Sequence, residues 1–159
     1  MGSHSSLITL FEDVTRDLST NLTFGYGSAD DFNSGERRYP YVWLDPMTGN
    51  FPSDSTVSNI IRWNCTLNFL KLDDKVGNEK ETAIVWDEMF DIMEKWIHKL
   101  DREFLNDETD SRIQSGNIEL QDVRFNTLKK GTRDLVSGWV LSFTVITQSN
   151  FTYCSIYES

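Results

Sequence analysis

The clearest structural signal in the chain lies between Ile60 and Leu72, where apolar and polar residues alternate strictly from Ile61 to Phe69. Alternation with a period of two predicts a strand that has one face in a core and the other face in polar surroundings. The apolar set consists of Ile61, Trp63, Cys65, Leu67 and Phe69. The polar set consists of Arg62, Asn64, Thr66 and Asn68.

A long helical pattern follows this strand after an acidic turn at 73–78. Apolar residues then recur at helical spacing, which predicts a helix over about 79–104 with a single buried stripe. Asn78 is the expected N-cap of this helix. The stripe consists of Val85, Met89, Met93, Trp96, Leu100 and Phe104. We expect it to pack against Trp63, Leu67, Trp139 and Phe143.

The remaining periodic segments predict one short helix and three more strands. The helix covers about 7–18, and the strands cover 39–44, 118–125 and 135–146. The alternation changes phase within 118–125, so we expect a β-bulge near Gln121 and Asp122. Because consecutive strands usually pair, the sequence predicts an α+β fold of order α-β-β-α-β-β. Its sheet is expected to be four-stranded and mostly antiparallel, with both helices on one face.

Two segments are expected to lie outside these elements. Residues 23–38 contain three glycines and predict a long loop, which we expect to be mobile in the isolated protomer and ordered by a neighbouring subunit. An acidic region at 107–110 is a candidate partner for the arginines that end this loop. The loop residues expected at the contact are Phe24, Tyr26, Phe32, Arg37 and Arg38. The aromatic tail at 149–159 is expected to dock or to add a strand.

Length and charge limit the classes of function. A chain of 159 residues fits one domain spanning 1–159. The net charge of −10, from 25 acidic and 15 basic residues, opposes tight binding to nucleic acid, which requires Lys and Arg against phosphate. No apolar run approaches the length of a membrane span, so we expect no membrane partner.

Candidate catalytic chemistry is sparse. His4 lies at the start of the chain, and His98 lies on the long helix beside Ile97 and away from the buried stripe, where a surface histidine is the expected role. No metal-ligand spacing, glycine-rich phosphate loop or nucleophile elbow is present in the sequence. Acidic pairs such as Asp30 and Asp31 suit a glycosidase or a divalent-metal site, but they fall in predicted turns, where solvated charge is the usual role. We therefore expect no catalytic, cofactor-binding or metal-binding residues, no cofactor, and no enzymatic activity.

The order of elements resembles that of tail terminator, or tail completion, proteins of long-tailed bacteriophages, and of related neck and head–tail joining proteins. The resemblance covers nearly the whole chain. It is carried by the strand at 39–43 that ends at Asp45 and Pro46, the alternating strand at 63–69, the long helix, and the last strand with its segment 138–143. It implies a homo-hexameric ring that caps the tail tube and joins it to the connector, with DNA passing through an acidic lumen. It also implies a structural protein of the virion that is made in the host cytoplasm.

The polar strand face has a possible role in such a ring. We expect this face to contribute to subunit contact or to line the lumen. Its residues are Arg62, Asn64, Thr66, Asn68, Ser142 and Thr144. The alternative interpretation is a small ligand-binding or enzymatic α+β domain, with a pocket between the long helix and the sheet. The residues expected to line that pocket are Trp63, Trp86, Trp96 and Trp139.

Overall fold

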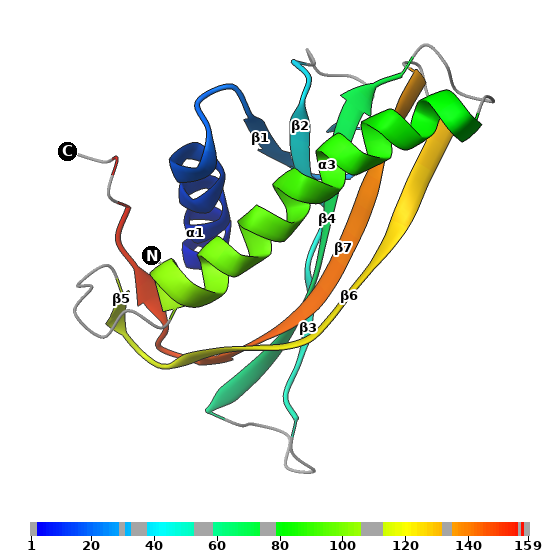
Figure 1. Ribbon diagram of the computed structural model, residues 1–159. Helices are drawn as coiled ribbons and strands as arrows, with labels where there is room; N and C mark the ends of the chain where they lie inside the picture. Colours follow the sequence, from blue (N-terminus) through cyan, green and yellow to red (C-terminus); the bar gives the residue numbers. More distant parts are fainter. Residues whose placement is uncertain are drawn as a thin grey trace.

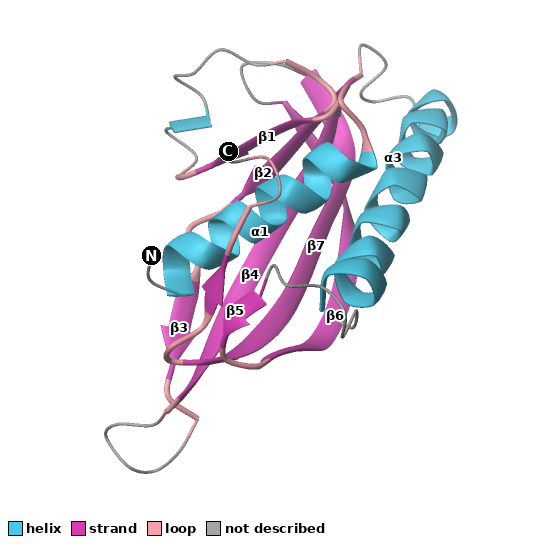
Figure 2. Ribbon diagram, turned by 90° about the vertical axis from the view of Figure 1, so that its left-hand side faces the viewer, coloured by secondary structure: helices cyan, strands magenta, loops and turns pink. Residues whose placement is uncertain are grey.

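The computed structural model shows an α+β fold in which two helices cover one face of a twisted sheet (Figures 1 and 2). The structure describes residues 3–28, 31–32, 38–52, 59–73, 79–105, 113–131, 135–155 and 157. In chain order the elements are α1 (Ser3–Leu18), β1 (Thr23–Tyr26), β2 (Tyr41–Leu44), β3 (Thr48–Asn50), β4 (Ile60–Leu72), α3 (Glu79–Lys99), a π-helical turn η1 (Leu100–Leu105), β5 (Ile113–Ser115), β6 (Ile118–Gly131), β7 (Leu135–Gln148) and β8 (Thr152–Tyr153).

The main sheet is larger than predicted and mixed in direction. Six of the described strands form it, in the order β1-β2-β4-β7-β6, with β3 paired to β4 beside this path. All of its pairs are antiparallel except β1 with β2, which is parallel. The expected four-stranded, mostly antiparallel sheet of order α-β-β-α-β-β is therefore wrong in strand number and order, whereas the α+β class and the placement of both helices on one face are confirmed.

The two extra strands come from segments that were predicted to be irregular. Residues 23–38 were expected to form a loop, yet their first four residues form β1 along β2. Gly25 permits this pairing, because a Cβ at that position would lie 2.5 Å from the Tyr41 hydroxyl and 2.8 Å from the Trp43 ring. The turn after Leu44 contains β3. At the other end of the sheet, β6 continues through Gly131, where a turn was expected.

The register of β4 and β7 confirms the predicted alternation. Cys65 lies opposite Phe143 and Leu67 lies opposite Leu141, and all four side chains are buried beneath the helices. The predicted bulge is also present in β6, between Gln121 and Arg124. There Asp122 has a φ of 54°, so the two halves of the strand present opposite phases to β7.

The core between the helices and the sheet is built around Trp96. Its ring lies 5.7 Å from Phe11 of α1, and 6.0 Å from both Phe69 and Phe143 of the sheet. Its indole N–H donates to the Thr15 hydroxyl at 3.0 Å, so this buried polar group has a partner. The predicted stripe is confirmed at Met89, Met93, Trp96, Leu100 and Phe104, each at most 2% exposed.

Two expected partners of the stripe, Trp63 and Trp139, are half-buried and pack at the margin of this core. Trp63 packs beside His4, because the start of α1 covers that part of β4, and donates to the Thr147 hydroxyl at 3.2 Å. Trp139 packs against Phe90 and Phe125 at the β6 side of the sheet.

The chain end docks on the first helix, as the aromatic tail predicted. Strand β8 pairs with β5 in a separate two-stranded sheet (Figure 1). The backbone N–H of Tyr153 donates to the Ser6 hydroxyl of α1 at 3.2 Å. The predicted N-cap Asn78 and the segment 74–78 lie outside the described residues. Among the described helices, none is long and apolar enough to cross a membrane.

Candidate interaction surface

The sheet face opposite the helices carries the polar row that the sequence predicted. In the β4–β7 register, Asn64 lies opposite Thr144 and Thr66 lies opposite Ser142. Strand β6 extends the row, because Arg124 lies opposite Ser142. Figure 2 shows both helices on the other side of the sheet. The alternation therefore gathers side chains from three strands into one polar surface.

Members of this row differ in how available they are. Arg62 and Asn64 are exposed, and Thr66, Asn68 and Ser142 are half-buried. Thr144 is only 7% exposed. A side chain this deeply buried has little surface to offer to a neighbouring subunit or to a lumen. Hence Arg62 and Asn64 are the most accessible of the predicted set on this face.

Hydrogen bonds tie part of the row to neighbouring strands. The Asn64 amide donates to the Thr48 hydroxyl of β3 at 3.3 Å. The Asn68 amide donates to the Trp43 carbonyl at 3.3 Å and to Oδ1 of Asp45 at 3.0 Å. These side chains hold the turn after β2 and strand β3 against β4, so they serve the protomer's own fold.

An aromatic cluster covers one end of the same face. Phe32 lies 5.1 Å from the Trp43 ring and 5.8 Å from the Tyr41 ring, both in edge-on geometry. The Trp43 indole N–H donates to the Gly27 carbonyl at 3.1 Å. Burial in this cluster raises the pKa of Tyr41 above its ordinary value. The segment after β1 is thereby attached to its own sheet.

The expected loop contact therefore needs correction. Phe32 is only 8% exposed and Phe24 packs against the main core. The protomer itself buries Phe32 and half-buries Phe24, because β2 presents aromatic side chains on the face of Phe32 and Val42 on the face of Phe24. Tyr26, in contrast, is 58% exposed, and Arg38 is exposed. Arg37 and its expected acidic partners at 107–110 lie outside the described residues.

A second accessible surface was missed by the sequence analysis. Strand β6 forms one edge of the main sheet, and its Val123 and Phe125 are 44% and 48% exposed. One side of the Phe125 ring packs on Phe90 and Trp139, at 5.6 Å and 5.7 Å. The phase change in the sequence was a usable signal, because bulges are frequent at sheet edges.

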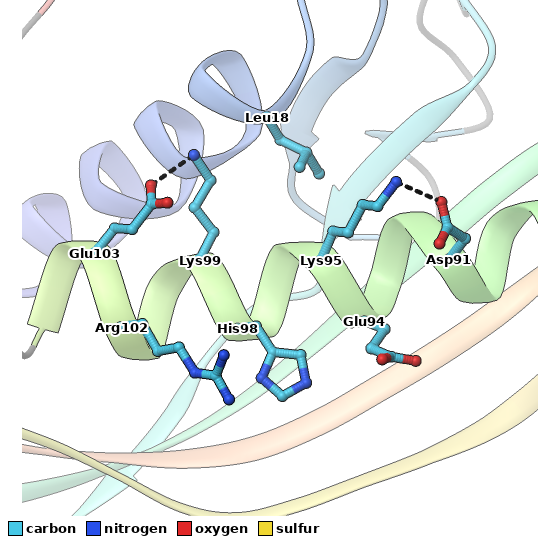
Figure 3. Close-up of a pocket in the computed structure, with 8 residues that line it drawn as sticks. All are labelled: Leu18, Asp91, Glu94, Lys95, His98, Lys99, Arg102 and Glu103. Carbon is cyan, nitrogen blue, oxygen red and sulfur yellow. Dashed lines mark hydrogen bonds and ion pairs between the residues drawn. The ribbon is translucent and has the colours of Figure 1, made fainter.

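A charged groove of about 390 Å³ lies along α3. Figure 3 shows the side chains that line it. The Lys99 ammonium lies 2.9 Å from Asp17 of α1 and 2.6 Å from Glu103. Burial alone would lower the pKa of Lys99, but these two hydrogen-bonded carboxylates outweigh it and raise the pKa. Lys95 pairs with Asp91 at 2.8 Å. Because carboxylates neutralise both lysines, we interpret the groove as an ion-paired helix surface and not as a ligand site. His98 is exposed at this groove, as expected.

The four tryptophans of the alternative interpretation lie in different surroundings. Trp96 is fully buried in the packed core, and Trp63 lies near the start of α1. Trp86 donates to the Leu128 carbonyl at 3.3 Å, and Trp139 donates to the Trp86 carbonyl at 2.8 Å. They do not share one pocket, so the ligand site imagined for them is not assembled. Among the described residues, no group of three or more His, Cys, Asp or Glu side chains is placed to hold a metal ion.

Comparison with known proteins adds no relative to this picture. No protein-family model matches the sequence, and no curated protein matches it either. Function is therefore inferred from the surfaces of the protein described above.

Proposed function

We propose that this protein is a structural component of a bacteriophage virion that forms a homo-hexameric ring at the tail–neck junction. In this role it caps the tail tube, contacts the connector or neck proteins, and lets DNA pass through the ring. The observation that carries the proposal is the polar face across β4, β7 and β6 that neither helix covers, where Arg62, Asn64 and Arg124 are exposed, on a sheet with two different edges. A protomer with unlike edges is suited to a head-to-tail contact, and such contacts form a ring when the rotation between successive copies closes.

Charge supports an arrangement of the two faces within the ring. The outward side of α3 exposes four carboxylates, of which Glu88 and Asp91 are paired with Lys71 and Lys95. The sheet face, in contrast, exposes Arg62 and Arg124 beside the carboxylate of Glu119. The exposed carboxylates of α3 are Asp87, Glu88, Asp91 and Glu94. Acidic side chains repel DNA phosphates and basic side chains attract them. We therefore place α3 toward the lumen and the sheet face toward neighbouring proteins.

Co-assembly with tail-tube protein tests this proposal. The purified protein is mixed with assembled tubes and viewed by electron microscopy. The proposal predicts rings in the protein alone and caps at one end of the tubes. Tubes that remain uncapped, together with a protein that forms no ring, would contradict it. A variant with Arg62→Glu serves as a probe of the sheet face: it should still form rings but cap fewer tubes.

A further inference from the structure

A small apolar hollow lies at the sheet edge opposite β6. It has a volume of about 160 Å³ and is formed by the start of α1, the end of β1 and the turn after β2. Its apolar lining comes from Ile8, Leu44, Pro46 and Met47, with Tyr26 beside them. His4 and Asp45 complete the lining. Cavities of about 150 Å³ can hold a benzene ring, so the hollow has the size needed for one aromatic side chain.

The edge formed by β6 presents such a side chain. Phe125 is 48% exposed and lies on the helix-covered side of the sheet, since it stands opposite the buried Leu141. Its neighbour Arg124 is exposed and lies on the polar side, opposite Ser142. One edge of the sheet thus offers an aromatic group on one face and a cation on the other.

The hollow offers the complementary pair on the same two faces. Leu44 stands opposite Leu67, which is buried under the helices. Asp45 accepts a hydrogen bond from Asn68 of the polar row, which places its carboxylate toward the polar side. Two copies can lie side by side with the β6 edge of one against the hollow of the other and with their helices on the same side. In that arrangement Phe125 of one copy faces the apolar hollow of the other, and Arg124 faces Asp45.

We infer that Phe125 of one protomer occupies the hollow of the next copy of this chain, with Arg124 approaching that copy's Asp45. This inference rests on the proposed ring and identifies its subunit contact. A second copy is the occupant that the structure favours, because size, polarity and charge match between the two edges of a single chain. The contact is head-to-tail, since the two surfaces are different, and its repetition forms the proposed ring when the rotation between copies closes.

Replacement of Phe125 is the first test. Phe125→Asp should dissociate the ring, because a carboxylate cannot enter an apolar hollow without losing its hydration. Phe51→Asp is the matched control, since Phe51 is 47% exposed and lies outside both proposed surfaces. Masses are compared by sedimentation at equal concentration. If both variants keep the ring mass, the inference is overturned while the ring itself stands; if the parent protein is a monomer, the proposed function fails as well.

A charge exchange makes the test independent of protomer stability. Arg124→Asp and Asp45→Arg should each weaken association at least about tenfold, because each places like charges across the contact. A mixture of the two single variants should assemble again, with the variants alternating around the ring. An intramolecular effect cannot be rescued by mixing. Failure of the mixture to assemble, with both variants shown to be folded by circular dichroism, would overturn the proposed pairing.

Discussion

The hydroxyl of Tyr153 donates a hydrogen bond of 2.6 Å to the carboxylate of Asp13, deep in the protein. Tyr153 and Asp13 are 1% and 2% exposed. The hydroxyl of Ser155 donates to the other carboxylate oxygen at 3.0 Å. A buried carboxylate is stabilised only when hydrogen bonds replace its lost hydration, so the C-terminal segment and α1 depend on each other.

Tyr153→Phe tests this dependence. The variant keeps the aromatic ring of residue 153 but removes a hydroxyl that donates to a buried carboxylate, which should cost about 1.5–3 kcal/mol in the free energy of unfolding. Urea denaturation measures the loss. Tyr157→Phe is the control, since the Tyr157 hydroxyl is 3.4 Å from Asp17 at an exposed site. Equal losses in the free energy of unfolding for the two substitutions would show that the buried hydrogen bond stabilises the protein no more than the exposed one.

Removal of the Trp96 side chain tests the core assignment. Trp96→Ala should lower the free energy of unfolding by about 3–5 kcal/mol, through lost burial and the cavity left behind. Ile84→Ala on the same helix should change it by less than about 0.5 kcal/mol, because Ile84 is 62% exposed. A melting temperature unchanged by Trp96→Ala would show that the buried face of α3 is wrongly assigned.

Gly138 provides a test of the β4–β7 pairing. A Cβ at this position would lie 1.7 Å from the Phe69 carbonyl oxygen, so Gly138→Ala requires the backbones of the two strands to separate. We expect a loss of more than about 3 kcal/mol, within the severe range of single substitutions. Gly49→Ala is the control, because its Cβ would come no closer than 3.2 Å, to the Trp63 ring. Similar melting temperatures for both variants would contradict the close approach.

The parts of the fold that bury one face were the parts the sequence could predict. The alternation around Cys65 and the stripe around Trp96 are imposed by a core on one side, so their periods are visible in the sequence. Strand β1 was missed because its glycine signals a loop, whereas the close approach of Tyr41 and Trp43 demands glycine within a strand. The hollow at Met47 was missed because it combines segments that are distant in the chain. The exposed surface at Phe125 lies on one strand, and the phase change of the alternation was its signal.

The buried thiol of Cys65 gives a prediction for alkaline pH. Burial raises the pKa of Cys65 to about 12, whereas an unfolded thiol has a pKa of about 8.5. Between these values the unfolded chain loses a proton that the folded chain keeps, so stability falls as pH rises, by at most about 1.4 kcal/mol per pH unit. Below pH 8.5 this group contributes no pH dependence. The free energy of unfolding of the parent protein should therefore be lower at pH 9.5 than at pH 8.5, and this difference should shrink in Cys65→Ala.

Thiol labelling checks the same environment directly. Cys154 is exposed and Cys65 is 1% exposed. At pH 8 a disulfide reagent should titrate one thiol per folded chain and two in denaturant. The Cys154→Ser variant should show no fast reaction until it is unfolded. Rapid reaction of Cys65 in that folded variant would contradict its burial beneath α1 and α3.

The solution mass of the purified protein tests the central claim most directly. Multi-angle light scattering at micromolar concentration should give six times the protomer mass of 18.4 kDa, and Phe125→Asp should return it to the protomer mass. A parent protein that stays at the protomer mass, both alone and with tail-tube protein present, would contradict the ring.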